Sequence, residues 1–197
     1  PRLKSGADPA LAFAGTFHIA ESFTQLERAF KVSEQGELPS PLPSEIYCHT
    51  LSDPSILSKD LQERGFHTLT LFGLHVPAKL FDGDNDAMRQ RAQAAAFAAL
   101  NEYLVDPIES VIAKNSDGSL CVESKTPLDL EEAISLPRGN IFHRELAFPF
   151  REDGTAPSWG VETSHPRILI CGAGAIRGGG VSGIPGHNAA MAILQKD

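Results

Sequence analysis

The chain has 197 residues, of which 42% are hydrophobic and 21% are charged, and its formal net charge is -8. That length allows one large domain or two small ones around a buried core. The acidic balance argues against a surface for nucleic acid or anionic membrane, because both require a positive patch. No apolar run approaches the roughly 20 residues that cross a bilayer, so no transmembrane segment is expected.

The first residues and the cysteines bear on processing and compartment. The start lacks an initiator Met and an apolar signal core, which predicts a trimmed or truncated chain, although mature ends look alike. Cys48, Cys121 and Cys171 are an odd number without a CxxC spacing, so no disulfide framework is expected. A reducing, cytoplasmic compartment fits this pattern best, and Cys171 is interpreted as a small core residue.

A first amphipathic helix is predicted over residues 20–33. Phe23, Leu26 and Phe30 follow the i, i+3, i+7 spacing of a buried helical face, and Gly36 supplies a stop. The proline-rich segment that follows neither continues a helix nor pairs within a sheet, so we expect a rigid connector.

Two strands and the clearest helix come next. Residues 44–50 and 67–76 are rich in β-formers and are bounded by turn residues, which predicts strands. A helix is predicted over 84–104, with Asp82 or Asp84 as its cap and an alanine-rich stretch that permits close packing.

Shorter signals lie between this helix and the tail. Asp117-Gly118, between two apolar runs, is typical of a hairpin turn. Thr126 followed by Pro127 is typical of a helix start, because proline suits the first helical position.

The last thirty or so residues have the order strand, glycine-rich loop and helix. A short strand is predicted over residues 167–171, because Arg167 is followed by a continuous apolar run, which is typical of a strand buried on both faces. A loop over 172–186 and a closing helix over 188–195 complete the tail. The whole pattern predicts an α+β architecture whose end suits an α/β nucleotide-binding domain.

The loop is dense in glycine, with Gly172, Gly174, Gly178, Gly179, Gly180, Gly183 and Gly186. Glycine lets backbone N–H groups approach a ligand without an intervening side chain. A helix N-terminus behind such a loop favours an anion or an electron-rich carbonyl. The alternative is a surface loop that only holds a terminal helix.

The loop is not a complete dinucleotide-binding motif. A Rossmann unit needs a helix, a second strand and an acidic residue about 20 positions further on. Only 19 residues follow Gly178, and no second strand fits among them. An NAD-only dehydrogenase is therefore disfavoured.

Other catalytic motifs are also incomplete. Residues 180–184 miss the final glycine of a GxSxG nucleophile elbow. The seven histidines show no HExxH or comparable spacing, so structural histidines and no metal are expected. No residue is assigned as catalytic, which is compatible with flavin enzymes, where the cofactor carries the redox chemistry.

Several segments resemble one family of flavoproteins. The segments 169–174, 178–183 and 185–190 are similar to the C-terminal signature of phytoene desaturase-like FAD-dependent oxidoreductases. The segments TPLDL (126–130) and GNIFH (139–143) resemble a narrower branch, which contains pyridine nucleotide-disulphide oxidoreductase domain-containing protein 2.

The resemblance implies a two-domain flavoprotein in which an amino-terminal GxGxxG unit, missing here, holds the adenosine and pyrophosphate of FAD. It implies an N-terminal linking segment over 1–35 and part of a substrate domain, with an antiparallel sheet and helices, over 36–150. Residues 151–197 are then a strand-loop-helix return into the FAD-binding domain. The residues implied to bind FAD are Gly172, Gly174, Gly178, Gly179, Gly180, Val181, Gly183, Gly186 and Asn188.

The chain departs from the family pattern at two positions. Ile176-Arg177 stands where the family usually has His-Pro, and Arg177 either contacts a phosphate or a substrate carboxylate or is an exposed loop residue. His187 precedes Asn188 and either hydrogen-bonds the flavin edge or faces solvent. His143 is singled out by its motif without an assigned role.

These implications predict the C-terminal part of an FAD-dependent oxidoreductase that acts on an apolar small molecule. We expect the chain alone to be inactive and not to retain FAD, and an exposed apolar surface to favour self-association. The alternative is a non-enzymatic interaction module that keeps the flavoprotein scaffold.

Overall fold

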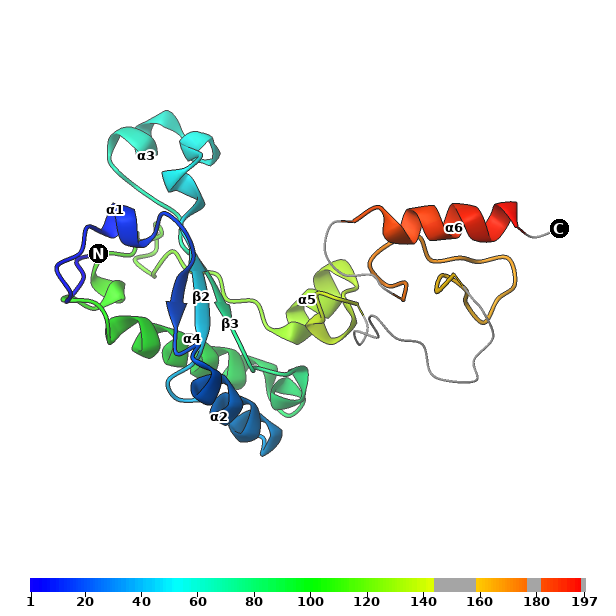
Figure 1. Cartoon of the computed structure of the whole chain (residues 1–197). Helices are drawn as coiled ribbons and strands as arrows, with labels where there is room; N and C mark the ends of the chain where they lie inside the picture. Colours follow the sequence, from blue (N-terminus) through cyan, green and yellow to red (C-terminus); the bar gives the residue numbers. More distant parts are fainter. Residues whose placement is uncertain (144–158, 177–181, 196–197) are drawn as a thin grey trace. The chain divides into compact units, whose positions relative to one another are not determined.

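The computed structural model describes residues 1–143, 159–176 and 182–195. The chain divides into two compact units, Pro1–Thr126 (unit 1) and Pro127–Asp197 (unit 2) (Figure 1). The domains expected over 1–35, 36–150 and 151–197 concern a longer flavoprotein, and that division stays a prediction.

Unit 1 is built on an antiparallel sheet in the order β1-β2-β3, with strands β1 (Phe17–Ile19), β2 (Ser44–Tyr47) and β3 (Thr70–Gly73). Its α-helices are α1 (Pro9–Ala12), α2 (Phe23–Glu34), α3 (Lys59–Glu63) and α4 (Asn85–Asn101). Short 3-10 helices lie in the connections, namely η1 (His49–Leu51), η2 (Pro54–Ile56), η3 (Ala78–Phe81) and η4 (Ile108–Ser110).

The described part of unit 2 contains α5 (Pro127–Ile134), the 3-10 helix η5 (Pro137–Gly139) and α6 (Ile184–Leu194). Six α-helices and three antiparallel strands among the described residues confirm the α+β class. No helix within the described ranges has both the length and the apolar character that crossing a membrane requires.

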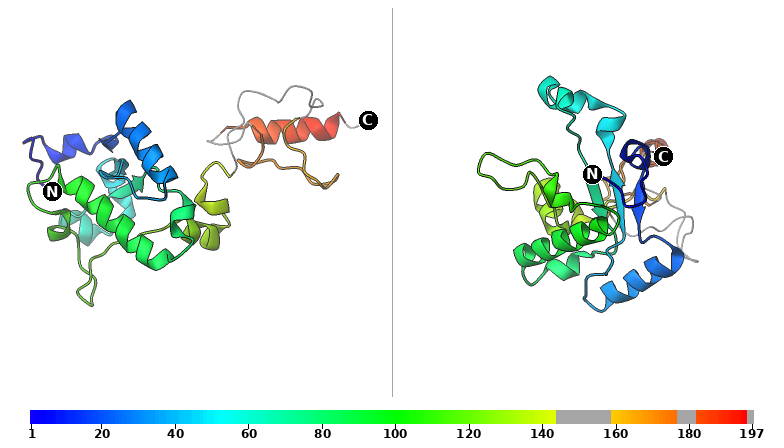
Figure 2. Two further views of the ribbon diagram at one scale, coloured as in Figure 1. Left: turned by 90° about the horizontal axis from the view of Figure 1, so that it is seen from below. Right: turned by 90° about the vertical axis from the view of Figure 1, so that its left-hand side faces the viewer.

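The core of unit 1 lies between the sheet and α4. Ile19 of β1 and Ile46 of β2 are buried together with Ala99 and Leu100 of α4. Because side chains alternate across a strand, the residues next to Ile19 in β1 and next to Ile46 in β2 point to the opposite face of the sheet. The segment with η1, η2 and α3 projects from one end of the sheet, away from α4 (Figure 2).

The clearest helix prediction is confirmed. The Asp84 carboxylate accepts the backbone N–H of Ala87 at 2.9 Å and so caps α4, which ends at Asn101 rather than at residue 104. Strands β2 and β3 lie inside their predicted ranges but are shorter, and β1 was not predicted.

The face that α2 buries differs from the prediction. Phe23 and Phe30 are 84% and 51% exposed, whereas Ala29 and Ser33 are buried. Small side chains allow close approach of the helix to its neighbours, so spacing of large apolar residues alone identified the wrong face.

The Asp117-Gly118 turn forms without the two strands of a hairpin. Gly118 has φ +85°, and the Asp117 carboxylate accepts the backbone N–H of Ser119 at 2.9 Å. One isolated bridge, between Lys114 and Leu120, is the only β-pairing that accompanies this turn among the described residues.

Candidate functional site

The described tail of unit 2 is held by a small core of its own. Its buried residues are Val161, Ala175, Ala189 and Ala192, and Trp159 and Leu169 pack against them. Ile170 N donates to Val161 O at 2.8 Å, and Ile176 N donates to Gly160 O at 2.8 Å. These bonds tie Gly160 and Val161 to the segment 170–176, and the shared cluster packs both against α6.

The strand predicted over 167–171 is wrong in its extent and in its burial. Its β-pairing is the single antiparallel bridge between Glu162 and Leu169. Ile168 is 55% exposed, and Cys171 is exposed rather than in the core. A strand buried on both faces needs neighbouring strands and covering helices, and the described part of unit 2 supplies only the short segment at Val161.

The turn at residues 159–162 fixes the position of α6. The Glu162 carboxylate accepts the backbone N–H groups of Trp159 at 2.9 Å and of Val161 at 3.0 Å. Burial raises the pKa of Glu162, but the backbone N–H groups outweigh that effect, so its pKa lies below the ordinary value. Gly160 has φ +74°, and a Cβ there would lie 2.8 Å from Cβ of Ile176.

Helix α6 begins at Ile184, earlier than the predicted start at residue 188. Pro185 suits the first turn of a helix, which explains the earlier start. Gly183 is the N-cap and supplies no side-chain hydrogen bond. The N–H groups of Ile184 and Gly186 have no intrahelical acceptor, because they lie in the first turn of the helix. Pro185, between them, carries no N–H.

The two polar residues after this start have structural contacts. Asn188 Nδ2 donates to Trp159 O at 3.0 Å, which ties α6 to the turn below it. His187 is exposed, and its ring meets the Trp159 ring edge-on at 6.4 Å between centroids. Exposure of His187 fits both alternatives, the flavin edge and solvent, so its role stays a prediction.

Motif segments far apart in the sequence meet in unit 2. A Cβ at Gly139, which has φ +69°, would lie 2.5 Å from Cα of Pro127, so GNIFH packs closely on the start of TPLDL. A Cβ at Gly174 would lie 3.8 Å from Cβ of His143. His143 thus lies at the glycine-rich tail, a neighbourhood that its motif alone did not reveal.

The described glycines of the tail differ from Gly139 and Gly160, because their surroundings leave room for a Cβ atom. Gly172 and Gly183 have no heavy atom within 4 Å of the position of a Cβ, and Gly174 and Gly186 meet only ordinary contacts. None of these four has a positive φ that favours glycine. The four predicted residues Gly178, Gly179, Gly180 and Val181, and the neighbouring Arg177, lie outside the described residues.

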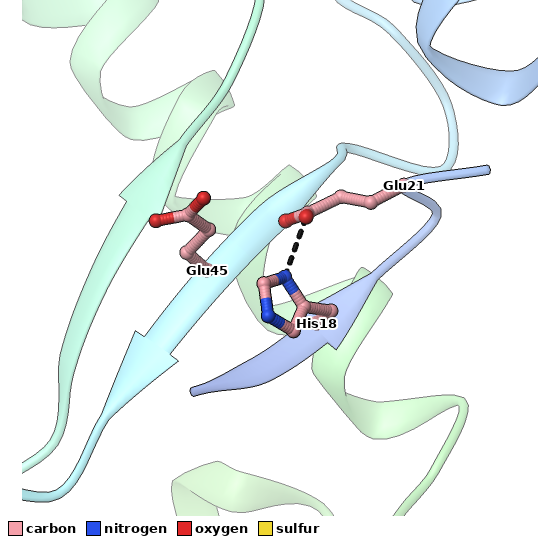
Figure 3. A group of neighbouring side chains, drawn as sticks. All are labelled: His18, Glu21 and Glu45. Atoms are coloured by element: carbon pink, nitrogen blue, oxygen red, sulfur yellow. Dashed lines mark hydrogen bonds and ion pairs between the residues drawn. The ribbon is translucent and has the colours of Figure 1, made fainter. Parts of the chain in front are cut away.

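Sequence reasoning gave no role to several residues that the structure singles out. Trp159 and Glu162 stand in no motif, yet they hold the start of α6. In unit 1, His18, Glu21 and Glu45 bring potential metal-ligand atoms together (Figure 3). Pairing across β1 and β2 creates that proximity, and sequence spacing did not indicate it.

Comparison with known proteins relates the chain to proteins with an oxidoreductase domain. It is 30% identical over 181 residues to pyridine nucleotide-disulfide oxidoreductase domain-containing protein 2 of Mus musculus, covering 86% of the chain and 28% of that protein. The corresponding Rattus norvegicus protein is 29% identical over 202 residues, covering 96% and 31%. This homology supports the narrower branch that the TPLDL and GNIFH segments indicated.

A higher similarity, 48% identity over 200 residues, is found to an uncharacterised protein of Mycobacterium tuberculosis, and it covers 98% of the chain. The chain spans 37% of the length of that relative. No family model and no solved structure matches the chain.

Proposed function

We propose that the chain is the C-terminal part of an FAD-dependent oxidoreductase of the phytoene desaturase-like type, and that its glycine-rich tail faces the cofactor. The relatives with an oxidoreductase domain in their names support the general class. The observation that carries the finer proposal is the unexplained glycine content of the described tail.

The described structure gives no reason for glycine at Gly172 and Gly183. Neither backbone conformation nor packing within the described residues excludes a side chain there. A ligand that lies against the backbone supplies the missing reason, because any Cβ would hold it away. Gly174 and Gly186 extend the same surface along the tail.

The start of α6 adds electrostatic complementarity to that surface. Its free N–H groups and the helix dipole place a partial positive charge of about half a unit beside the glycines. Such a charge favours a pyrophosphate or the electron-rich edge of a flavin ring. Residues 178–181 complete this loop in the proposal.

FAD would supply the redox chemistry, and the residues of this chain would orient it and exclude water from one side. The remainder of the longer protein, with a GxGxxG unit, would hold the adenine nucleotide. We assign residues 36–150 to a substrate domain for an apolar small molecule. We also propose a reducing, cytoplasmic compartment, and the three free cysteines are compatible with it.

The direct test is the flavin content of the full-length protein that contains this chain. We expect it to purify yellow with about one FAD per chain, and the 197-residue chain alone to bind FAD weakly. A colourless full-length protein that ignores added FAD would favour the interaction module. Submicromolar FAD binding by the 197-residue chain would contradict the division of the site.

A further inference from the structure

The sheet face opposite the core of unit 1 carries a histidine and a glutamate directly across from each other. His18 on β1 pairs with Glu45 on β2 in the antiparallel register. Their strand neighbours Ile19 and Ile46 are buried in the core, so His18 and Glu45 project from the other face (Figure 3).

A backbone reversal brings a third ligand to the same place. Ala20 adopts φ +53°, a left-handed conformation that is uncommon for residues other than glycine. The chain turns back at this residue, and the Glu21 side chain extends toward His18 (Figure 3). Glu21 Oε2 lies 2.5 Å from His18 Nδ1.

The three side chains each offer one ligand atom, and these atoms lie within 4.8 Å of one another. That spacing is close to the separation of ligands around one metal ion, since metal–ligand distances of about 2.0–2.2 Å place neighbouring donors 3–4 Å apart. Small movements of the three side chains would bring the separations between their ligand atoms into this range.

One oxygen of the cluster has no partner. Glu21 Oε1 is buried and accepts no hydrogen bond among the described residues, and the Glu21 side chain is only 16% exposed. A buried carboxylate oxygen without a partner costs free energy, so it calls for a ligand. This observation is independent of the spacing of the cluster.

The charge of the cluster also favours a cation. Glu21 and Glu45 together carry two negative charges, and neither forms an ion pair with a lysine or arginine in the part of the chain that the structure describes. Glu45 Oε2 accepts a hydrogen bond from the Tyr47 hydroxyl at 2.6 Å, which leaves its other oxygen available.

We propose that His18, Glu21 and Glu45 form a binding site for one divalent transition-metal ion, with water in the remaining coordination positions. A neutral imidazole and two carboxylates balance the charge of a divalent ion. The imidazole nitrogen selects zinc-like ions over Ca²⁺ and Mg²⁺, which prefer all-oxygen sites. The site lies in unit 1, away from the tail in sequence, and it does not rest on the proposed flavin site.

The test is titration of the 197-residue chain with Zn²⁺ by calorimetry and with Co²⁺ by visible absorption. We expect one equivalent to bind with a Kd on the order of 1 µM. His18→Gln and Glu45→Gln should each weaken binding at least about tenfold. Circular dichroism of both variants reports whether the fold is retained.

Two matched variants separate this site from adventitious metal binding. His49→Gln removes an exposed histidine next to the same strand, and it should leave the affinity unchanged. Tyr47→Phe removes only the hydroxyl that competes for Glu45, so binding should be equal or tighter. Absence of binding below about 100 µM, or equal affinities for wild type, His18→Gln and Glu45→Gln, would overturn the proposal.

Discussion

Unit 1 and unit 2 bury their apolar residues to different degrees. Twelve residues form the buried core cluster of unit 1, whereas four form that of the described part of unit 2. Yet eight large apolar side chains are exposed in the described part of unit 2, against nine in the longer unit 1. The exposed set in unit 2 is Ile134, Ile141, Phe142, Ile168, Ile170, Ile184, Ile193 and Leu194.

The two units therefore differ in how far their own buried contacts account for their stability. Unit 1 has a sheet, a covering helix and a continuous core, so its stability follows from its own contacts. The described part of unit 2 has a smaller buried cluster and leaves almost as many large apolar side chains exposed as the longer unit 1.

The largest effect is expected from a cavity in unit 1. Ile46 is 1% exposed, and Ile46→Ala should reduce the free energy of unfolding of unit 1 by about 2–5 kcal/mol. Urea denaturation followed by far-UV circular dichroism measures this loss. Fluorescence of Trp159, the only tryptophan, reports unit 2, and its transition should stay where it is in the wild type.

The exposed Ile56→Ala is the control, and it should change stability by less than about 0.5 kcal/mol. If Ile46→Ala moved the Trp159 transition as far as the circular dichroism transition, the two units would unfold together. Their stabilities would then not be independent, contrary to this prediction.

A smaller effect is expected at the junction of the two motif segments. Gly139→Ala introduces a Cβ 2.5 Å from Cα of Pro127 at a position with φ +69°, and should destabilise unit 2 by about 1–3 kcal/mol. Gly118→Ala is a matched control with φ +85° and open space, so it should show only the conformational cost, about 1 kcal/mol. Equal losses in the two variants would mean that the contact with Pro127 is unimportant.

Removing the cap of α4 should cost about 1 kcal/mol. Asp84→Ala deletes the acceptor of the Ala87 N–H, whereas Asp84→Asn retains an acceptor and should behave nearly as the wild type. Thermal unfolding of both variants is the measurement. An asparagine variant as unstable as the alanine variant would assign the effect to charge instead of to the capping hydrogen bond.

The smallest effect concerns pH and unit 2. The folded-state pKa of Glu162 lies below its ordinary value of 4.5, so its contribution is fully present above pH 4.5 and is lost as pH falls through the folded pKa. Its exposure limits that contribution to less than about 1 kcal/mol. Glu162→Gln should lower the stability of unit 2 at pH 7 and remove this acid dependence, as measured by Trp159 fluorescence. Parallel pH profiles for the variant and the wild type would contradict the role of the carboxylate.

How much the sequence could predict depended on the range of the interactions. The Asp84 cap, the Pro127 start and the Gly118 turn are local, so their residues predicted them. The buried face of α2 and the exposure of Ile168 depend on which distant segments cover them, and spacing alone misplaced both.

The candidate sites follow the same rule. The glycine-rich tail was visible as composition, but the contact of Gly174 with His143 arises only in the folded unit. The cluster of His18 and Glu45 depends on strand register, and Glu21 joins it through the reversal at Ala20. No sequence motif encodes that combination.

We propose that the tail glycines face a flavin, and the FAD affinities of two glycine variants of the full-length protein test this proposal. Gly172→Val and Gly15→Val both place a side chain in open space without a positive φ, but only the first lies in the tail. We expect Gly172→Val to weaken FAD binding at least about tenfold, with the thermal stability of the 197-residue chain unchanged, and Gly15→Val to leave FAD binding intact. Equal FAD affinity in wild type and Gly172→Val would contradict the account.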